Sequence, residues 1–319
     1  MRQRTVAAQG LALGVAAALL WWLANNTVHT LGQNGISLGF GFLRQPANFD
    51  IGDSIVAYSS SDSFLRAILV GLANTARVSA LGWVFATLLG FLLGVMRLST
   101  TPAVRAVSRG FVELVRNVPL LLLLLFLAAT MHALPPARAA LEPLPNVFIS
   151  DRGLVLPWFD FSGPQVAWVT PKLVGFNFVG GMTISPELTA LLFALVLHHA
   201  AHISEVVRGA VLAVPSRQRD AAHALGLSRA QTMRFVVIPQ ALRAMVPLLA
   251  TNWVSLTKNS SLAVAIGFPD LVSILNTTAN QTGHAIETML IMIVVYLTLS
   301  LAVAAAMNAY NGRLLRPGG

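Results

Sequence analysis

The sequence predicts an all-α, polytopic helical membrane protein. Of its 319 residues, 55% are hydrophobic and only 10% are charged, and the mean hydropathy is +0.71. A water-soluble domain does not have this composition. Several stretches contain the ~20 predominantly apolar residues that a spanning helix needs. The ten-residue alternation of an outer-membrane β-barrel is absent, so we expect a bundle of about six spanning helices.

The apolar segments give the order of these helices. The N-terminal run is interpreted as a spanning helix and not a cleaved signal peptide, because Trp21 and Trp22 suit an interfacial belt at its outer end. Residues 1–65 should hold this span and an outer segment, and residues 66–319 the core. The expected spans are about 6–26, 66–97, 111–134, 186–212, 235–256 and 286–310.

Basic residues between the spans indicate the orientation of the chain. With six spans both termini lie on one side, and the arginines gather on that side, which should be cytoplasmic. We therefore interpret the net charge of +9 as a sign of how the chain is oriented in the membrane, and we expect no nucleic-acid partner. These arginines are Arg2, Arg4, Arg97, Arg105, Arg109, Arg208, Arg217, Arg219, Arg229, Arg234, Arg313 and Arg316.

Local signals mark several boundaries and contacts. Ser185-Pro186-Glu187 has the cap, first-turn proline and acid that begin a helix. Gly90-x-x-x-Gly94 is a small-residue spacing that lets helices approach closely. The insertion at 134–185, rich in Pro, Gly, Trp and Phe, is too interrupted for a span, so we expect an ordered outer cap there.

A basic corner interrupts the apolar chain at 214–232. Ser216 is expected to cap a short helix that ends at Gly226, the left-handed stop. Ser228 and Gln231 then form a capping box that starts a second helix. The sequence therefore predicts a rigid helix, turn and helix in the cytoplasm.

The exposed residues of this corner are small. Ala221, Ala222 and Ala224 should give a narrow ridge that enters a groove on a partner, with arginines at its rim. An ordinary folded cytoplasmic loop is the alternative.

Several motifs carry a resemblance to a known family. Asp220-Ala-Ala, Gly226 and Ile238-Pro239 resemble the "EAA…G…(I/L)LP" coupling loop of ATP-binding-cassette (ABC) importer permeases, with Asp220 in place of the usual glutamate. "GFGFLRQPANFDIG" at 39–52 and the long insertion are similar to the larger permease subunit of general L-amino-acid importers. Five further stretches resemble the polar amino-acid permease family. They are "GLANTARVSALG" (71–82), "VELVRNVPLLLLLLF" (112–126), "SEVVRGAV" (204–211), "ALGLSRAQTMRFVVIPQALR" (224–243) and "LTKNSSLA" (256–263).

This resemblance implies the type I ABC importer transmembrane-domain architecture in a bacterial inner membrane. It also implies a complex with a second permease subunit of different sequence, a dimer of ATPase subunits and a periplasmic amino-acid-binding protein. The chain lacks a G-x-x-x-x-G-K-[ST] phosphate loop. We therefore expect a non-enzymatic subunit without a bound cofactor, with ATP and Mg in the partner ATPase. The implied coupling residues are Asp220, Ala221, Ala222, Leu225, Gly226 and Pro239.

His198, His202 and Glu205 lie on one face of the fourth span, at i, i+4 and i+7. Three readings stay open. The stripe could hold a metal, although nothing else in the chain completes such a site. It could meet the charged groups of an amino acid in transit. It could also be a polar seam between helices, with Glu205 paired to Arg208 or Arg116.

Further polar residues within or beside spans are candidates for the transport path. For each, helix packing or geometry is the competing reading. They are Asn74, Thr75, Arg116, Asn117, Lys258, Asn259 and Ser260.

Two other functions compete with an ATP-driven importer. An ion-coupled secondary amino-acid carrier or channel would use the histidine stripe as a proton relay. A membrane scaffold or receptor would bind partners through the corner and move no solute.

Overall fold

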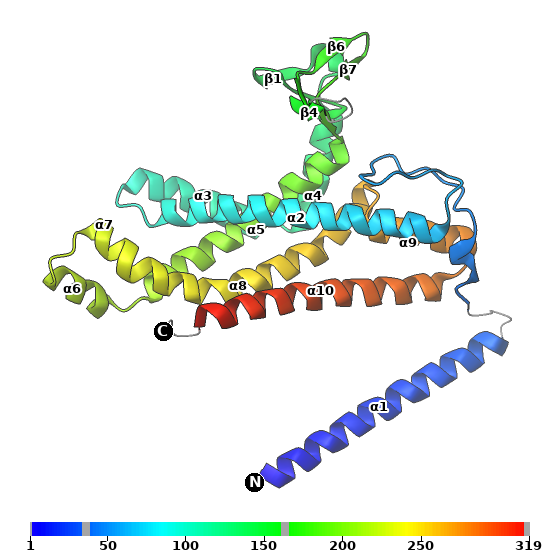
Figure 1. Ribbon diagram of the computed structural model, residues 1–319, viewed down its shortest axis with the longest axis horizontal. Helices are drawn as coiled ribbons and strands as arrows, with labels where there is room; N and C mark the ends of the chain where they lie inside the picture. Colours follow the sequence, from blue (N-terminus) through cyan, green and yellow to red (C-terminus); the bar gives the residue numbers. More distant parts are fainter. Residues whose placement is uncertain (1, 34–38, 161–165, 316–319) are drawn as a thin grey trace.

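The computed structural model describes residues 2–33, 39–160 and 166–315. Most of these residues are helical, and the long helices form an elongated bundle (Figure 1). The helices are α1 (Arg2–Gln33), α2 (Phe64–Arg97), α3 (Pro102–Asn117), α4 (Leu120–His132), α5 (Pro186–Ala213), α6 (Ser216–Ala224), α7 (Arg229–Thr232), α8 (Ile238–Asn259), α9 (Leu271–Thr282) and α10 (Ala285–Leu315), with the 3-10 segments η1 (Gly41–Arg44), η2 (Ala137–Ala139) and η4 (Ser260–Ile266) and the π-helical turn η3 (Met233–Val237).

Four helical stretches of the described chain are long and apolar enough to cross a membrane, or five if α3 and α4 count as one bent span. These stretches correspond to the expected spans at 66–97, 186–212, 235–256 and 286–310. The expected span at 6–26 falls in α1, where many side chains lie outside the described residues. The four stretches are Phe64–Arg97, Pro186–Ala213, Arg229–Ile266 and Ala285–Met307.

The expected span at 111–134, with its bend at Pro119, consists of two helices, because the chain turns by 100° between α3 and α4. Pro119 causes the break. The residue before a proline avoids the helical region, and Val118 is accordingly extended, with φ −91° and ψ 126°. Since proline also lacks the N–H that would continue the helix, a new helix begins at Leu120.

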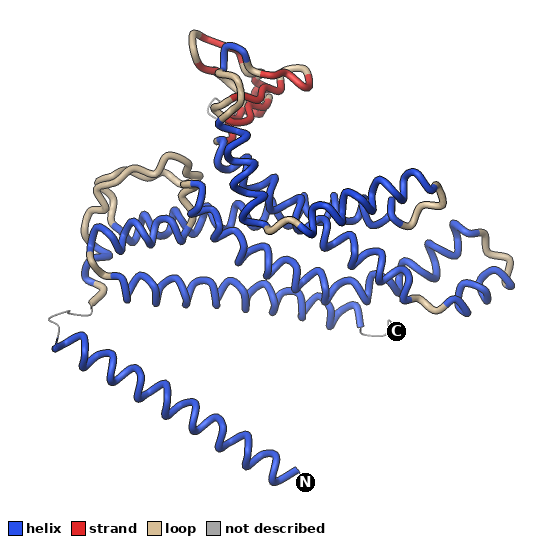
Figure 2. Tube along the Cα trace, turned by 180° about the vertical axis from the view of Figure 1, so that it is seen from behind, coloured by secondary structure: helices blue, strands red, loops and turns tan. Residues whose placement is uncertain are grey.

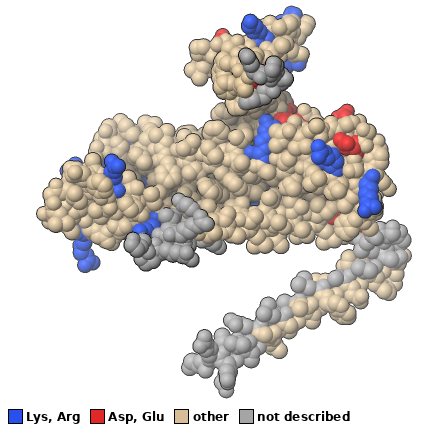
Figure 3. All heavy atoms as spheres, viewed as in Figure 1, with Lys and Arg blue, Asp and Glu red and all other residues tan. Residues whose placement is uncertain are grey.

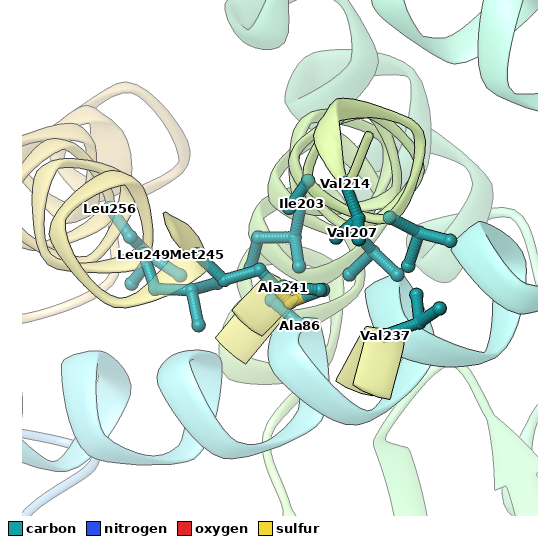
Figure 4. Packing of buried hydrophobic residues seen from close by; sticks show 11 residues of the cluster. Ala86, Ile203, Val207, Val214, Val237, Ala241, Met245, Leu249 and Leu256 are labelled. Atoms are coloured by element: carbon teal, nitrogen blue, oxygen red, sulfur yellow. The ribbon is translucent and has the colours of Figure 1, made fainter. Parts of the chain in front are cut away.

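Helices α2 and α5 form the most extensive helix contact of the bundle. A Cβ added to Gly90 would lie 2.6 Å from the Cβ of Ile203, and one added to Gly94 would lie 2.6 Å from the Cβ of Val207. The predicted packing role of these glycines is confirmed. Ile203 and Val207 also belong to a buried cluster that includes Met245 and other residues of α8 (Figure 4).

Gly94→Ala should lower the melting temperature, because the new methyl group forces α2 and α5 apart at a cost of ~1–3 kcal/mol. Gly209→Ala is the matched control, since nothing lies within 4 Å of a Cβ at that helical position. Thermal unfolding of both variants in detergent measures the difference. Equal melting temperatures would contradict the close contact.

The insertion forms a small β module above α4 and the start of α5 (Figure 2). Its strands are antiparallel and belong to one four-stranded sheet, in the order β1-β2-β3-β8, and two hairpins, β4-β5 and β6-β7. The described residues of the insertion, which is expected to be an ordered outer cap, thus form regular strands, and they add strands to a fold predicted as all-α. The strands are β1 (Leu141–Leu144), β2 (Val147–Ser150), β3 (Gly153–Leu156), β4 (Trp158–Asp160), β5 (Ala167–Val169), β6 (Lys172–Val174), β7 (Asn177–Val179) and β8 (Met182–Ile184).

The segment that leads into α2 packs against the end of the bundle opposite α6. Phe42 and Ala47 are buried in a cluster with Phe64 of α2 and Leu271 of α9. Asp53 forms an ion pair with Arg77, with 2.9 Å between Oδ1 and Nη1. This segment therefore contacts the core directly.

Candidate functional site

The turn at Gly226, in the corner between α5 and α8, has the left-handed structure that the sequence predicts. Gly226 has φ +81°, a backbone conformation that L side chains rarely adopt. The N–H of Gly226 donates to the carbonyl of His223 at 2.9 Å, and the N–H of Leu227 donates to the carbonyl of Ala222 at 3.1 Å. These two bonds form a Schellman motif, which satisfies the last carbonyls of α6 and fixes the turn.

The second helix of the corner begins at the predicted capping box. The backbone N–H of Gln231 donates to the Ser228 hydroxyl at 3.4 Å, and the N–H of Ser228 donates to the Gln231 side-chain oxygen at 2.9 Å. The expected cap at Ser216 is wrong, because Pro215 is the N-cap of α6 and makes no side-chain bond. Proline pre-sets a backbone angle that suits the start of a helix, and the serine becomes its first residue.

A π-helical turn joins the corner to α8. The N–H of Ile238 donates to the carbonyl of Met233, five residues earlier. Pro239 has no N–H to offer the carbonyl of Phe235 and would clash with it in a regular helix, so the wider turn accommodates the proline. Pro239 thus shapes the entry of the corner into the membrane.

The exposed face of α6 differs from the predicted ridge. Asp220, Ala221 and Ala224 are exposed, but Ala222 is only 4% exposed and faces the rest of the corner. Leu225, at the end of α6, is 83% exposed. Asp220, Ala221, Ala224 and Leu225 therefore form the exposed side of the corner at the end of α6.

The two histidines of the stripe lie beside a third histidine, His199, which was not part of the prediction. The rings of His198 and His202 lie 4.8 Å apart between centroids, while the neighbouring His199 is buried and its Nε2 lies 3.2 Å from Nδ2 of Asn259. Among the described residues, no three His, Asp or Glu side chains are placed to hold a metal ion. The hydrogen bond from this part of α5 to α8 is therefore made by His199, which lies outside the stripe.

Glu205 is the centre of an arginine cluster. Its carboxylate lies 2.8 Å from Nη2 of Arg97, 3.1 Å from Nη1 of Arg116 and 2.9 Å from Nη2 of Arg208. The reading in which Glu205 pairs with Arg208 or Arg116 agrees with these contacts, which include both arginines, and sequence reasoning missed Arg97. The cluster ties α2, α3 and α5 together at the end of the bundle where α6 begins.

Asn74 and Thr75 join α2 to the start of α9. The Asn74 amide donates to the carbonyls of Asp53 and Pro269 at 2.7 and 2.9 Å. The Thr75 hydroxyl accepts the backbone N–H of Leu271 at 3.0 Å. Both side chains are buried and have structural partners.

The other path candidates lie at two separate places. Asn117 is exposed at the break between α3 and α4. Lys258 is exposed, whereas Ser260 is buried and donates to the carbonyl of Thr257 at 2.8 Å. Lys258 lines a largely apolar groove of about 600 Å³ between the end of α8, η4, α9 and α10. Asn117 thus directly follows Arg116 of the Glu205 cluster, whereas Lys258 and Ser260 lie where α8 ends.

Asp270 is a buried acid that sequence reasoning placed only among the outer charges. It is 1% exposed, and its Oδ1 accepts the backbone N–H of Ser273 at 2.8 Å at the start of α9. The Tyr296 hydroxyl lies 3.5 Å from its Oδ2. Burial raises the pKa of the Asp270 carboxyl from 3.8 to about 7.

This carboxyl should make the stability of the chain depend on pH. Because its pKa is raised in the folded chain, the folded state binds more protons than the unfolded state between about pH 4 and about pH 7, so stability falls as pH rises through that range. Asp270→Asn keeps the helix cap and cannot ionise, so the melting temperature of this variant should depend less on pH in this range. The exposed Asp50→Asn is the control, and melting temperatures across that range test the difference. Parallel profiles for wild type and Asp270→Asn would refute it.

Comparison with known proteins gives one family and several relatives. The family described as "Binding-protein-dependent transport system inner membrane component" matches residues 86–316. The chain is 37% identical to the putative amino-acid ABC transporter permease protein YhdX of Escherichia coli (strain K12), and the match covers 96% of this chain and 93% of the relative. It is 34% identical to the general L-amino acid transport system permease protein AapQ of Rhizobium johnstonii, with 98% and 92% covered.

A solved structure shares the fold. It is described as the crystal structure of an amino acid ABC transporter with histidines, and the match has a TM-score of 0.59 at 23% identity. It covers 78% of this chain and 95% of that chain.

Proposed function

Because the chain belongs to the family of inner-membrane components of binding-protein-dependent transport systems, we propose that it is the permease subunit of an ATP-driven importer of polar or general L-amino acids. The observation that carries this proposal is the corner at α6 and α7. It is capped at its turn and at the start of its second helix, and it exposes Leu225. The names of the relatives support amino acids as the solute.

The corner is joined to the bundle on both sides, as a coupling element must be. Val214 lies between α5 and α6, and Val237 precedes α8; both are buried in the cluster that contains Ile203 and Val207 (Figure 4). The side chain of Gln240 on α8 also donates to that of Gln218 on α6. A displacement of α6 by a partner therefore reaches α5 and α8 together.

The partner that moves α6 is an ATPase dimer, which binds ATP and Mg and hydrolyses the ATP. This chain acts without catalytic residues or a cofactor of its own, in line with the missing phosphate loop. The remaining partners are a second permease subunit of different sequence and a periplasmic amino-acid-binding protein. Asp220 and Ala221 would contact the ATPase beside Leu225, since all three are exposed.

The charge distribution supports an inner-membrane orientation with α6 in the cytoplasm. On the face that Figure 3 shows, Lys and Arg without Asp or Glu mark the end that carries α6 and α7, and both signs appear at the opposite end. Helix α1 begins and α10 ends toward the same side as α6 (Figure 1). Both termini are thus proposed to be cytoplasmic.

The contacts narrow the candidates for the transport path. His198 and His202 on α5, and Lys258 and Asn259 at the end of α8, remain the proposed path residues, because an amino acid needs polar partners within the bilayer. Glu205 is instead proposed to hold the helices together, as it is occupied by three arginines. Because three arginines already pair with its carboxylate, Glu205 is also unsuited to a proton relay in an ion-coupled carrier.

Co-expression with the neighbouring genes, purification through a tag on this chain and reconstitution into proteoliposomes would test the proposal. We expect an ATPase to co-purify, and amino-acid uptake to require ATP and a binding protein. Uptake by the chain alone, driven by an ion gradient, would overturn the proposal. Stable partners without any solute flux would point to a scaffold.

A further inference from the structure

A polar hollow of about 370 Å³ lies where α2 ends beside α3 and α5. It is near the corner but separate from the exposed face of α6. Four arginines and two glutamates line it: Arg97, Arg105, Arg109, Glu113, Glu205 and Arg208.

Both glutamates of the hollow are already paired. Glu113 accepts from Arg109 at 2.7 Å, and Glu205 is held by Arg97, Arg208 and the adjacent Arg116, as described above. Arg105 forms no ion pair among the described residues. The hollow therefore keeps an excess of positive charge that no part of the described chain neutralises.

The arginine at the base of the hollow is fixed in place. The Arg97 side chain is only 7% exposed, and its guanidinium donates to Glu205 at 2.8 Å and to the Ser204 hydroxyl at 3.4 Å. Guanidinium groups present a planar fork that matches the oxygens of phosphate. A buried, positioned arginine beside an unpaired one is an arrangement that recruits such an anion.

The position of the hollow suits the surface of a bilayer. It lies at the end of two candidate spans, Phe64–Arg97 and Pro186–Ala213. On α3, Val107 and Leu114 are 69% and 66% exposed, and helical geometry places them on the side opposite the arginines. Apolar residues on one side of a helix and basic residues on the other are typical of helices at the headgroup level.

We propose that this hollow binds a phosphate-type oxyanion, either the headgroup of an anionic phospholipid or a free phosphate. This oxyanion is not the transported solute. The proposal therefore gives the chain, already proposed to be a permease, a second kind of ligand. Bound there, the anion would bridge Arg105 of α3 to Arg97 of α2 and Arg208 of α5.

Thermal unfolding of the full chain, purified with its accompanying subunits, tests the proposal. Inorganic phosphate is titrated at constant ionic strength, and short-chain phosphatidylglycerol is compared with phosphatidylcholine. We expect a saturable rise in melting temperature, and an apparent Kd about tenfold weaker in Arg105→Gln. Arg243→Gln removes the same charge from an exposed position on α8 and should bind as wild type does. Arg105→Lys keeps the charge but loses the fork, and should give an intermediate Kd.

The outcomes separate the two sources of the anion. Stabilisation by phosphatidylglycerol and not by phosphatidylcholine, lost in Arg105→Gln, assigns a lipid headgroup, whereas stabilisation by inorganic phosphate alone assigns a soluble anion. The proposal is overturned if neither probe stabilises the wild type, or if Arg105→Gln and Arg243→Gln respond alike. Since the measurement involves no transport, this failure would leave the proposed permease function intact.

Discussion

Leu225→Asp is expected to reduce ATP-dependent uptake by about tenfold or more while the chain stays folded. Leu225 is 83% exposed, so the change removes little packing within the chain. Burial of a leucine in a partner's groove contributes ~1.5–3 kcal/mol, and a carboxylate buried there would lack a partner; each ~1.4 kcal/mol is a factor of ten. Uptake in proteoliposomes and the amount of co-purified ATPase measure the effect.

Leu144→Asp on the β module is the matched control, because Leu144 is also an exposed leucine, at 63%. It should co-purify the ATPase and transport as wild type does. Gly226→Val should resemble Leu225→Asp, since valine is strained at φ +81° and would disturb the turn. Normal coupling in both corner variants would exclude the corner as the docking element. Ala222→Glu is less informative, because Ala222 is buried and the variant would disrupt the corner itself.

Glu205→Gln is expected to cost ~3–5 kcal/mol of stability, because it leaves the buried Arg97 without its counter-charge. The melting temperature of the purified chain should fall clearly. Glu113→Gln is the matched control. Glu113 and Arg109 are 51% and 69% exposed, and such surface pairs contribute only ~0–1 kcal/mol.

A double variant separates loss of charge balance from loss of packing. If the cost of Glu205→Gln arises from the unpaired guanidinium, Arg97→Gln combined with it should restore part of the stability. Equal melting temperatures for Glu205→Gln and Glu113→Gln would contradict the central role of Glu205.

The features that sequence could predict are those set by neighbouring residues. The turn at Gly226 and the capping box at Ser228 depend on a few adjacent side chains, and both are confirmed. The burial of Ala222 depends instead on how α6 packs against the helix after it, which a local pattern does not contain. Arg208 is only three residues from Glu205 in the sequence, so their pairing could be predicted locally. Arg97 is 108 residues from Glu205, and its pairing could be found only from the three-dimensional fold.

Other differences arise where a local signal permits several outcomes. Pro119 was visible in the sequence, but a proline allows either a kinked span or a break, and contacts with α2 and α5 accompany the 100° bend. The strands of the insertion have only three or four residues each. That length is too short for alternation to distinguish a strand from a loop.

The close contact of α2 with α5 limits how the bundle can change shape. Gly90 and Gly94 leave no clearance for a Cβ against Ile203 and Val207, so sliding one helix along the other would drive the larger side chains beside these glycines into the opposite backbone. The two helices must therefore travel as one stiff body. Because α5 leads into the corner and α2 has 34 residues, about 50 Å of helix, a displacement of the corner would be transmitted along both helices to the opposite end of the bundle.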